Sequence, residues 1–140
     1  MANSTDLVPG KWQLTESDNF EAFMAALGIG YLTRKLGNQS KPLVTISQEG
    51  EEWTFKQESL VKLNMGKQFE EVTADGRKVL TTNSVVAPNT LLQEMLGTGG
   101  GKDSVCTREF TAEKMKCVCS VDDIVTTRWY QRHSNYHVNI

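Results

Sequence analysis

The chain has 140 residues, a length typical of one domain. Fifteen lysines and arginines against seventeen aspartates and glutamates leave a formal net charge of -2, which lacks the basic excess expected of a nucleic-acid-binding protein. Apolar residues make up 39% of the chain, and no apolar run approaches the ~18 residues of a membrane-spanning helix. We therefore expect residues 1–140 to form a single folded domain that binds no nucleic acid.

The amino-terminal segment, residues 1–9, has neither a basic start nor an apolar stretch, so it does not match a secretion signal. The chain has three cysteines, an odd number that favours free thiols in a reducing compartment over a disulfide framework. Both observations predict a cytoplasmic protein.

The first predicted elements are one strand and two short helices. Residues 10–16 alternate between apolar and polar, which is typical of a half-buried strand. Apolar residues then recur at helical spacing, which predicts a helix with Ser17 as its N-cap and Gly28 at its end. A second apolar stripe over residues 29–36 predicts another helix that ends at Gly37. Together the two helices predict a helix-turn-helix lid.

From Leu43 onward the apolar period is two, with turn residues between the runs, which is typical of consecutive hairpins. The expected strands are residues 43–48, 53–58, 60–65, 68–73, 78–86, 91–96, 104–110, 115–121 and 124–132. No strand–helix–strand alternation occurs, so an antiparallel meander is expected. Ten such strands avoid open edges by closing into a barrel or clam, which leaves room for a small ligand. The predicted fold is an all-β, up-and-down β-clam with a helical lid.

Three polar residues on late strands could form an anion site. Arg128 and Tyr130 are two residues apart, so they point to the same face of the last strand. Arg108 lies on another predicted strand, and the three side chains would converge if these faces turn inward. Guanidinium groups match the geometry of a carboxylate, and a tyrosine hydroxyl can complete the site. The alternative is that both arginines face solvent and pair with Glu109 or Asp122.

Other motifs point to no further chemistry. The glycine-rich run at residues 97–103 resembles a phosphate loop, but its lysine precedes Asp103 instead of serine or threonine, so a hairpin turn is expected. Cys117 and Cys119 alternate to the same face of a predicted strand, and Cys106 could approach them, yet the Cys-x-Cys spacing does not match a structural zinc site. We expect thiols that line the cavity, no metal and no cofactor. No nucleophile has a visible base partner, so enzymatic activity is not predicted.

Several segments resemble the intracellular lipid-binding proteins, most closely the heart, adipocyte and myelin branch of the fatty-acid-binding proteins. The resemblance covers roughly residues 8–133. It rests on Gly10-Lys11-Trp12-Gln13-Leu14, the run from Ser17 to Met24, Leu27-Gly28-Ile29-Gly30, Thr33-Arg34-Lys35, Lys41-Pro42, the run from Gln68 to Asp75, and Thr127-Arg128-Trp129-Tyr130.

This resemblance implies a ten-stranded clam whose cavity carries fatty acids or retinoids. By position, Arg108, Arg128 and Tyr130 match the family's carboxylate-binding residues, with Arg108 acting directly or through water. Retinol-binding branches have neutral residues at the two arginine positions, so an acid is implied as the ligand. We expect a monomeric carrier of a long-chain fatty acid. The alternatives are a retinoic acid carrier and a membrane-associated structural lipid-binding protein.

The predicted lid also carries residues that match the family. Phe20, Met24 and Ile29 match helix positions that contact the lipid tail, although packing within the lid would explain them equally well. Arg34 and Lys35 match a basic part of the lid, which implies transient contact with anionic membranes. A solvated helix end is the alternative for these two charges.

Three departures from the family pattern concern the cavity entrance, one turn and the carboxyl terminus. The run at residues 60–67 is about five residues shorter than usual, which predicts a wider entrance or a shifted hairpin register. The turn at residues 97–103 is about three residues longer than usual. Residues 134–140 extend beyond the family's usual end.

Overall fold

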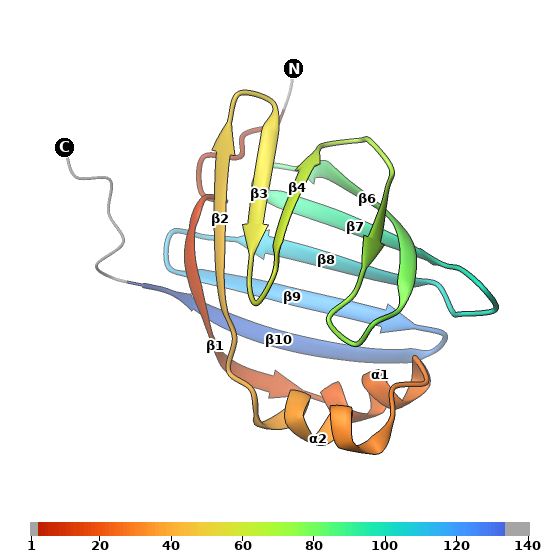
Figure 1. The fold of residues 1–140 in the computed structure, drawn as a ribbon. Helices are drawn as coiled ribbons and strands as arrows, with labels where there is room; N and C mark the ends of the chain where they lie inside the picture. Colours follow the sequence, from red (N-terminus) through yellow and green to blue (C-terminus); the bar gives the residue numbers. More distant parts are fainter. Residues whose placement is uncertain (1–2, 134–140) are drawn as a thin grey trace.

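The computed structural model describes residues 3–133, which form ten strands and two helices (Figure 1). The strands are β1 (Gly10–Asp18), β2 (Leu43–Glu49), β3 (Glu52–Lys56), β4 (Leu60–Asn64), β5 (Phe69–Val72), β6 (Lys78–Ala87), β7 (Thr90–Gly97), β8 (Ser104–Phe110), β9 (Lys114–Val121) and β10 (Ile124–Arg132). The helices are α1 (Phe20–Ala26) and α2 (Tyr31–Gln39). All ten strands join one antiparallel sheet in the order β4-β3-β2-β1-β10-β9-β8-β7-β6-β5. The predicted up-and-down β-clam with a helical lid is confirmed.

The sheet curls so that its two end strands, β4 and β5, approach each other across a gap (Figure 1). The loop after β4 crosses this gap, because the Gly66 N–H donates to the carbonyl of Asn83 on β6 at 2.6 Å. Gly66 has a φ of 78°, a left-handed conformation that favours glycine. Both helices cover one end of the clam, where α1 packs against β9 and β10.

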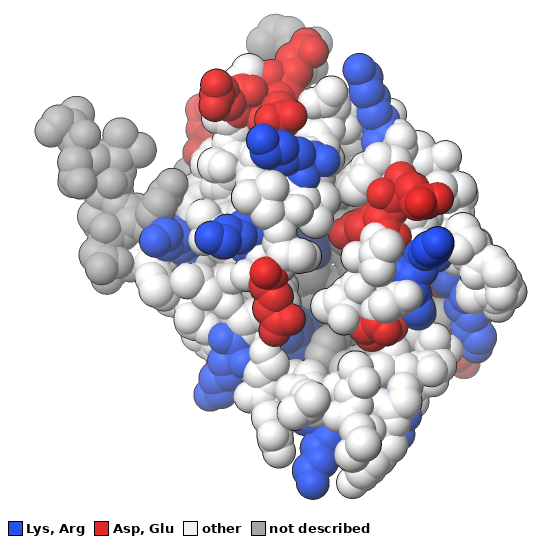
Figure 2. All heavy atoms as spheres, in the orientation of Figure 1, with Lys and Arg blue, Asp and Glu red and all other residues white. Residues whose placement is uncertain are grey.

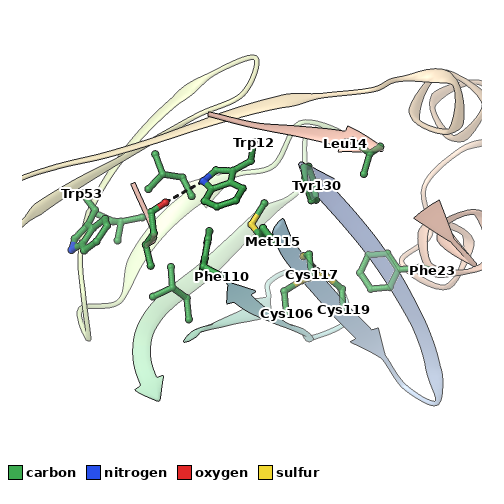
Figure 3. Packing of buried hydrophobic residues seen from close by; sticks show 14 of the residues in the cluster. Trp12, Leu14, Phe23, Trp53, Cys106, Phe110, Met115, Cys117, Cys119 and Tyr130 are labelled. Carbon is green, nitrogen blue, oxygen red and sulfur yellow. Dashed lines mark hydrogen bonds between the residues drawn. A yellow bond between two sulfur atoms is a disulfide. The ribbon is translucent and has the colours of Figure 1, made fainter. Parts of the chain in front are cut away.

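The apolar core fills the inside of the clam, and Trp12 is its largest fully buried side chain. The indole N–H of Trp12 donates to the Val8 carbonyl at 3.1 Å, and its ring packs edge-to-face on Phe110 with centroids 5.3 Å apart. Because β1 leads directly into α1, Trp12 lies on the half of the strand remote from the helices. Figure 3 shows the core running from Trp12 and Phe110 past Met115 to Phe23 of α1.

The predicted N-cap at Ser17 is wrong. Strand β1 continues to Asp18, because its ladder with β10 pairs Ser17 with Arg128 and Asp18 with Thr127. Asn19 precedes α1 instead, in a left-handed conformation with a φ of 63° and without a capping hydrogen bond from its side chain. Pairing with a strand more than 100 residues away overrides the local capping preference of serine.

The predicted helix end at Gly37 is also wrong. Gly37 lies within α2, which continues to Gln39. A Cβ atom at Gly37 would lie 2.9 Å from the sulfur of Met24 and close to the ring of Phe20. The glycine therefore permits close packing of α2 on α1, a tertiary requirement that its sequence position does not reveal.

The turn between β5 and β6 is held together by Asp75. Its carboxylate accepts hydrogen bonds from the Thr73 hydroxyl at 2.8 Å and from Nε of Arg77 at 2.6 Å. Burial raises the pKa of Asp75, but the hydrogen bonds from Arg77 and Thr73 and the charge of Arg77 together outweigh burial and hold this pKa below its ordinary value. The ionised carboxylate therefore stabilises this turn, which borders the cavity.

Replacing Asp75 with asparagine should lower the free energy of unfolding by about 1 kcal/mol at neutral pH. Because the folded-state pKa is lowered, the wild-type advantage is complete above the unfolded value of about 4 and is lost as the pH falls through the folded value. Urea denaturation from pH 7 to pH 3 measures this convergence of the two proteins. Asp123→Asn, at an exposed position, is the control and should show no such effect. A difference that does not vary with pH would contradict the assignment.

Candidate functional site

The inside of the clam holds a cavity of about 230 Å³. Apolar side chains from β2, β3 and β4 line one wall, and polar side chains from β6, β7 and β8 line another. Residues 57–59 and 73–74, from two neighbouring turns, border its mouth. Figure 2 shows the recess on this face of the molecule.

Arg108 and Tyr130 both line this cavity. Nη1 of Arg108 donates to Oε1 of Gln93, on the neighbouring strand β7, at 3.1 Å. Tyr130 is 7% exposed and comes from β10. An arginine fork and a phenol from two strands thus reach the same interior space, where they could hold an anion.

Arg128 is buried on the inner face of β10 but is not among the residues that line the cavity. Its Nη1 donates to Oγ of Ser17 at 3.0 Å, and its guanidinium lies 3.7 Å from the ring centroid of Phe20. Strand register places Cys117 of β9 opposite Arg108 on one side and opposite Arg128 on the other. The two arginines therefore flank one cysteine on the same inner surface, with Arg128 at the lid side.

Neither Arg108 nor Arg128 forms an ion pair with a carboxylate of residues 3–133. Asp122 pairs with Lys102 instead, at 2.5 Å, and Glu109 is exposed on the outer face of β8. The alternative that the arginines pair with Glu109 or Asp122 is therefore wrong. Arg128 is buried and Arg108 is half-buried, and a guanidinium group withdrawn from water without a counter-ion is costly, which favours an anionic ligand inside the clam.

The three predicted tail contacts pack within the lid or beside it. The ring of Phe20 covers the guanidinium of Arg128 and stacks on Phe23, with the ring centroids 6.2 Å apart. Met24 is buried against α2. Ile29 is half-buried, and its carbonyl accepts a hydrogen bond from Arg34 at 2.5 Å. None of the three lines the cavity, so their contact with a lipid tail stays a prediction about the bound state.

The cysteines depart from the expectation of three free thiols. Cys106 on β8 and Cys119 on β9 lie opposite each other with Cα atoms 4.0 Å apart, and a disulfide joins them. Cys117 remains a buried thiol whose sulfur lies 3.5 Å from that of Cys119. The cross-strand register that brings Cys106 to Cys119 is a long-range feature, which cysteine counting does not detect. With two sulfurs bonded to each other, the cluster offers one thiol as a metal ligand.

The protein purified without reductant should therefore contain one reactive thiol per chain after denaturation. Reduction before the same titration should raise the number to three, because Cys106 and Cys119 are released. A colorimetric thiol assay in denaturant measures both values, and Cys117→Ser should give none before reduction. Three thiols in the unreduced protein would contradict the disulfide.

The polar residues along β6 and β7 were missed by the sequence analysis. Gln93 accepts the hydrogen bond of Arg108, and both Gln93 and Asn83 line the cavity. Glu71 on β5 lines it as well and accepts a hydrogen bond from Thr81 at 2.9 Å. A usable signal was present, because Asn83 follows Val79 and Thr81 at the inward positions of a predicted strand.

The model of the lipocalin / cytosolic fatty-acid binding protein family matches residues 9–133. The chain belongs to this family. Fatty acid-binding protein 5 of Rattus norvegicus is 38% identical over 137 residues, which cover 94% of this chain and 98% of the relative. Sodium/calcium exchanger regulatory protein 1 of Doryteuthis pealeii is 36% identical over 128 residues, 88% of this chain and 94% of the relative.

Solved structures of the fatty-acid-binding family share the fold. A Schistosoma mansoni fatty acid binding protein in complex with arachidonic acid superimposes with a TM-score of 0.88 at 31% identity, over 94% of this chain and 100% of that chain. These matches confirm the resemblance drawn from the sequence segments and the clam architecture. Within residues 3–133, no helix has the length and apolar character needed to cross a membrane.

Proposed function

We propose that the chain, acting as a single lipid-binding domain of residues 1–140, carries a long-chain fatty acid in its cavity. Arg108, Arg128 and Tyr130 bind the carboxylate, and apolar side chains of the cavity bind the tail. The observation that carries the proposal is the pair of inward arginines without a carboxylate partner in the described chain. Burial of the tail adds about 0.8 kcal/mol per methylene group, so charge and apolar contact act together.

Binding requires a change at the lid end of the cavity. The present volume of about 230 Å³ lies below the roughly 300–1,000 Å³ usual for ligand pockets. The ring of Phe20 covers the guanidinium of Arg128. Movement of Phe20 away from Arg128 would expose the second arginine to the carboxylate and free the space beside it.

We further infer a cytoplasmic, monomeric carrier without enzymatic activity. Cytosolic thiols keep most protein disulfides reduced. In that compartment Cys106 and Cys119 would be thiols, and their disulfide would form on oxidation. Size-exclusion chromatography tests the monomer.

A displacement experiment tests the function. The protein is stripped of lipid and loaded with a fluorescent reporter, which is then titrated with oleate, retinoic acid and retinol at matched concentrations. Displacement by oleate with retinol inert supports the acid carrier, and a stronger effect of retinoic acid favours the retinoid alternative. If none of the three compounds displaces the reporter, the carrier proposal is overturned.

A membrane-associated role is the second candidate, and the exposed surface of α2 favours it. Tyr31, Leu32 and Leu36 are 65%, 74% and 69% exposed, and Lys35 is exposed beside them. Arg34 is paired with Glu21, whereas Lys35 forms no ion pair within residues 3–133 and supplies the charge for anionic lipid. In Figure 2 the acidic side chains of this face lie away from the helical end. Cosedimentation with phosphatidylserine vesicles at low salt, lost in Lys35→Glu, tests this contact.

A further inference from the structure

The buried side-chain amide of Asn83 makes no hydrogen bond that would stabilise the fold. Asn83 is 1% exposed on the inner face of β6, and it lines the cavity. Neither its Oδ1 nor its Nδ2 has a hydrogen-bond partner, and within residues 3–133 these are the only buried side-chain polar atoms in that condition. Two buried polar atoms without hydrogen bonds destabilise the folded protein, so we expect the amide to bind a polar group inside the cavity.

The backbone of Asn83 takes part in the hydrogen bonding of the sheet, and this pairing does not involve its side chain. Asn83 pairs with Gln93 in the ladder between β6 and β7, and its carbonyl accepts the Gly66 N–H across the gap in the sheet. Neighbouring Thr81 shows the contrasting case, because its hydroxyl is paired with Glu71. An apolar side chain at position 83 would serve the sheet without this penalty.

Asn83 lines the same cavity as Arg108, which we assign to carboxylate binding. Gln93, its partner across the ladder, accepts the hydrogen bond of Arg108. Strands β6 and β8 are two strand spacings apart, about 9.6 Å. A chain whose carboxylate is held at Arg108 therefore has part of its length within reach of the Asn83 amide. On the facing wall, Val44, Phe55 and Leu63 offer only apolar contact.

We propose that the ligand is a long-chain fatty acid that carries a hydroxyl group on its chain, and that Asn83 binds this hydroxyl. The inference rests on the proposed fatty-acid function and names its substrate class. A hydroxyl both donates and accepts, so a single hydroxyl can donate to Oδ1 and accept from Nδ2 at the same time. A keto oxygen only accepts, which leaves Oδ1 unpaired, and a plain methylene chain leaves both atoms unpaired.

The test compares stearic acid with its hydroxy and keto derivatives, each substituted at carbon 6, 8, 10 or 12, by displacement of a cavity-bound reporter. In the wild type, one hydroxy isomer should bind more tightly than its keto counterpart and more tightly than the other hydroxy isomers. Asn83→Leu should reduce the ratio of hydroxystearate to stearate affinity by about tenfold, because the amide is lost while the apolar wall is extended.

Thr82→Leu is the matched control, since Thr82 is the neighbouring residue on β6 and does not line the cavity. Its affinity ratio should equal that of the wild type. If leucine prevents folding at position 83, Asn83→Val provides the smaller replacement, and the ranking of positional isomers by the wild type needs no variant.

The outcomes separate the two proposals. Equal affinity ratios in the wild type and Asn83→Leu, or no preferred hydroxy isomer, would overturn the hydroxyl site and assign the amide to a buried water, while stearate binding would still support the carrier. Failure of every acid to displace the reporter would overturn the carrier function itself.

Discussion

Replacing Arg128 with glutamine should weaken oleate binding by about 30-fold and change the binding of methyl oleate by less than about threefold. A charge-assisted hydrogen bond to a carboxylate contributes about 1.5–3 kcal/mol, and the ester lacks the charge that depends on it. Arg128 is suited to this role because it is 8% exposed, hydrogen-bonds the Ser17 hydroxyl and forms no ion pair with a carboxylate of residues 3–133. Isothermal titration with the acid and the ester measures the two affinities.

Arg108→Gln should likewise weaken binding of the acid more than binding of the ester, because Arg108 lines the cavity. Lys114→Gln, which removes an exposed charge from β9, is the control and should leave both affinities unchanged. Equal losses for acid and ester in the arginine variants would exclude carboxylate binding. They would instead indicate that the guanidinium groups hold the inner surface together, as the contact of Arg128 with Phe20 would allow.

Trp12→Ala should lower the free energy of unfolding by about 4 kcal/mol, the largest effect on stability that we expect. Its indole is fully buried, contacts Phe110 and hydrogen-bonds the Val8 carbonyl. The guanidinium of Arg132 also lies 4.1 Å from the centroid of the Trp12 ring system. Truncation leaves a cavity and removes all three contacts at the end of the clam remote from the lid.

Urea denaturation followed by far-UV circular dichroism measures this loss. Trp129→Ala is the matched control, because Trp129 is half-buried on the outer face of β10, where it contacts Lys116. This control substitution should lower the free energy of unfolding by about 1 kcal/mol, as expected for a residue outside the core. Similar losses for the two tryptophans would contradict the assignment of Trp12 to the principal core.

Local pattern was enough to determine the elements of this protein. Alternation with period two predicts all ten strands, and short runs with helical spacing predict both helices, because each pattern reflects which face of one element is buried. The position of Arg128 two residues before Tyr130 likewise places both on one face, and both are buried in the structure. The strand count alone favoured closure and a hollow interior.

Only the tertiary structure decided how these faces meet. Because β1 pairs with β10, Ser17 lies in a strand and hydrogen-bonds Arg128 instead of capping a helix. Gly37 lies within α2, where a larger residue would collide with Met24 of α1. The register of β8 and β9 brought Cys106 to Cys119, and that of β6 and β7 left the Asn83 amide facing the cavity beside Gln93. Each outcome depends on strand or helix register between distant segments, which a pattern read along one segment does not contain.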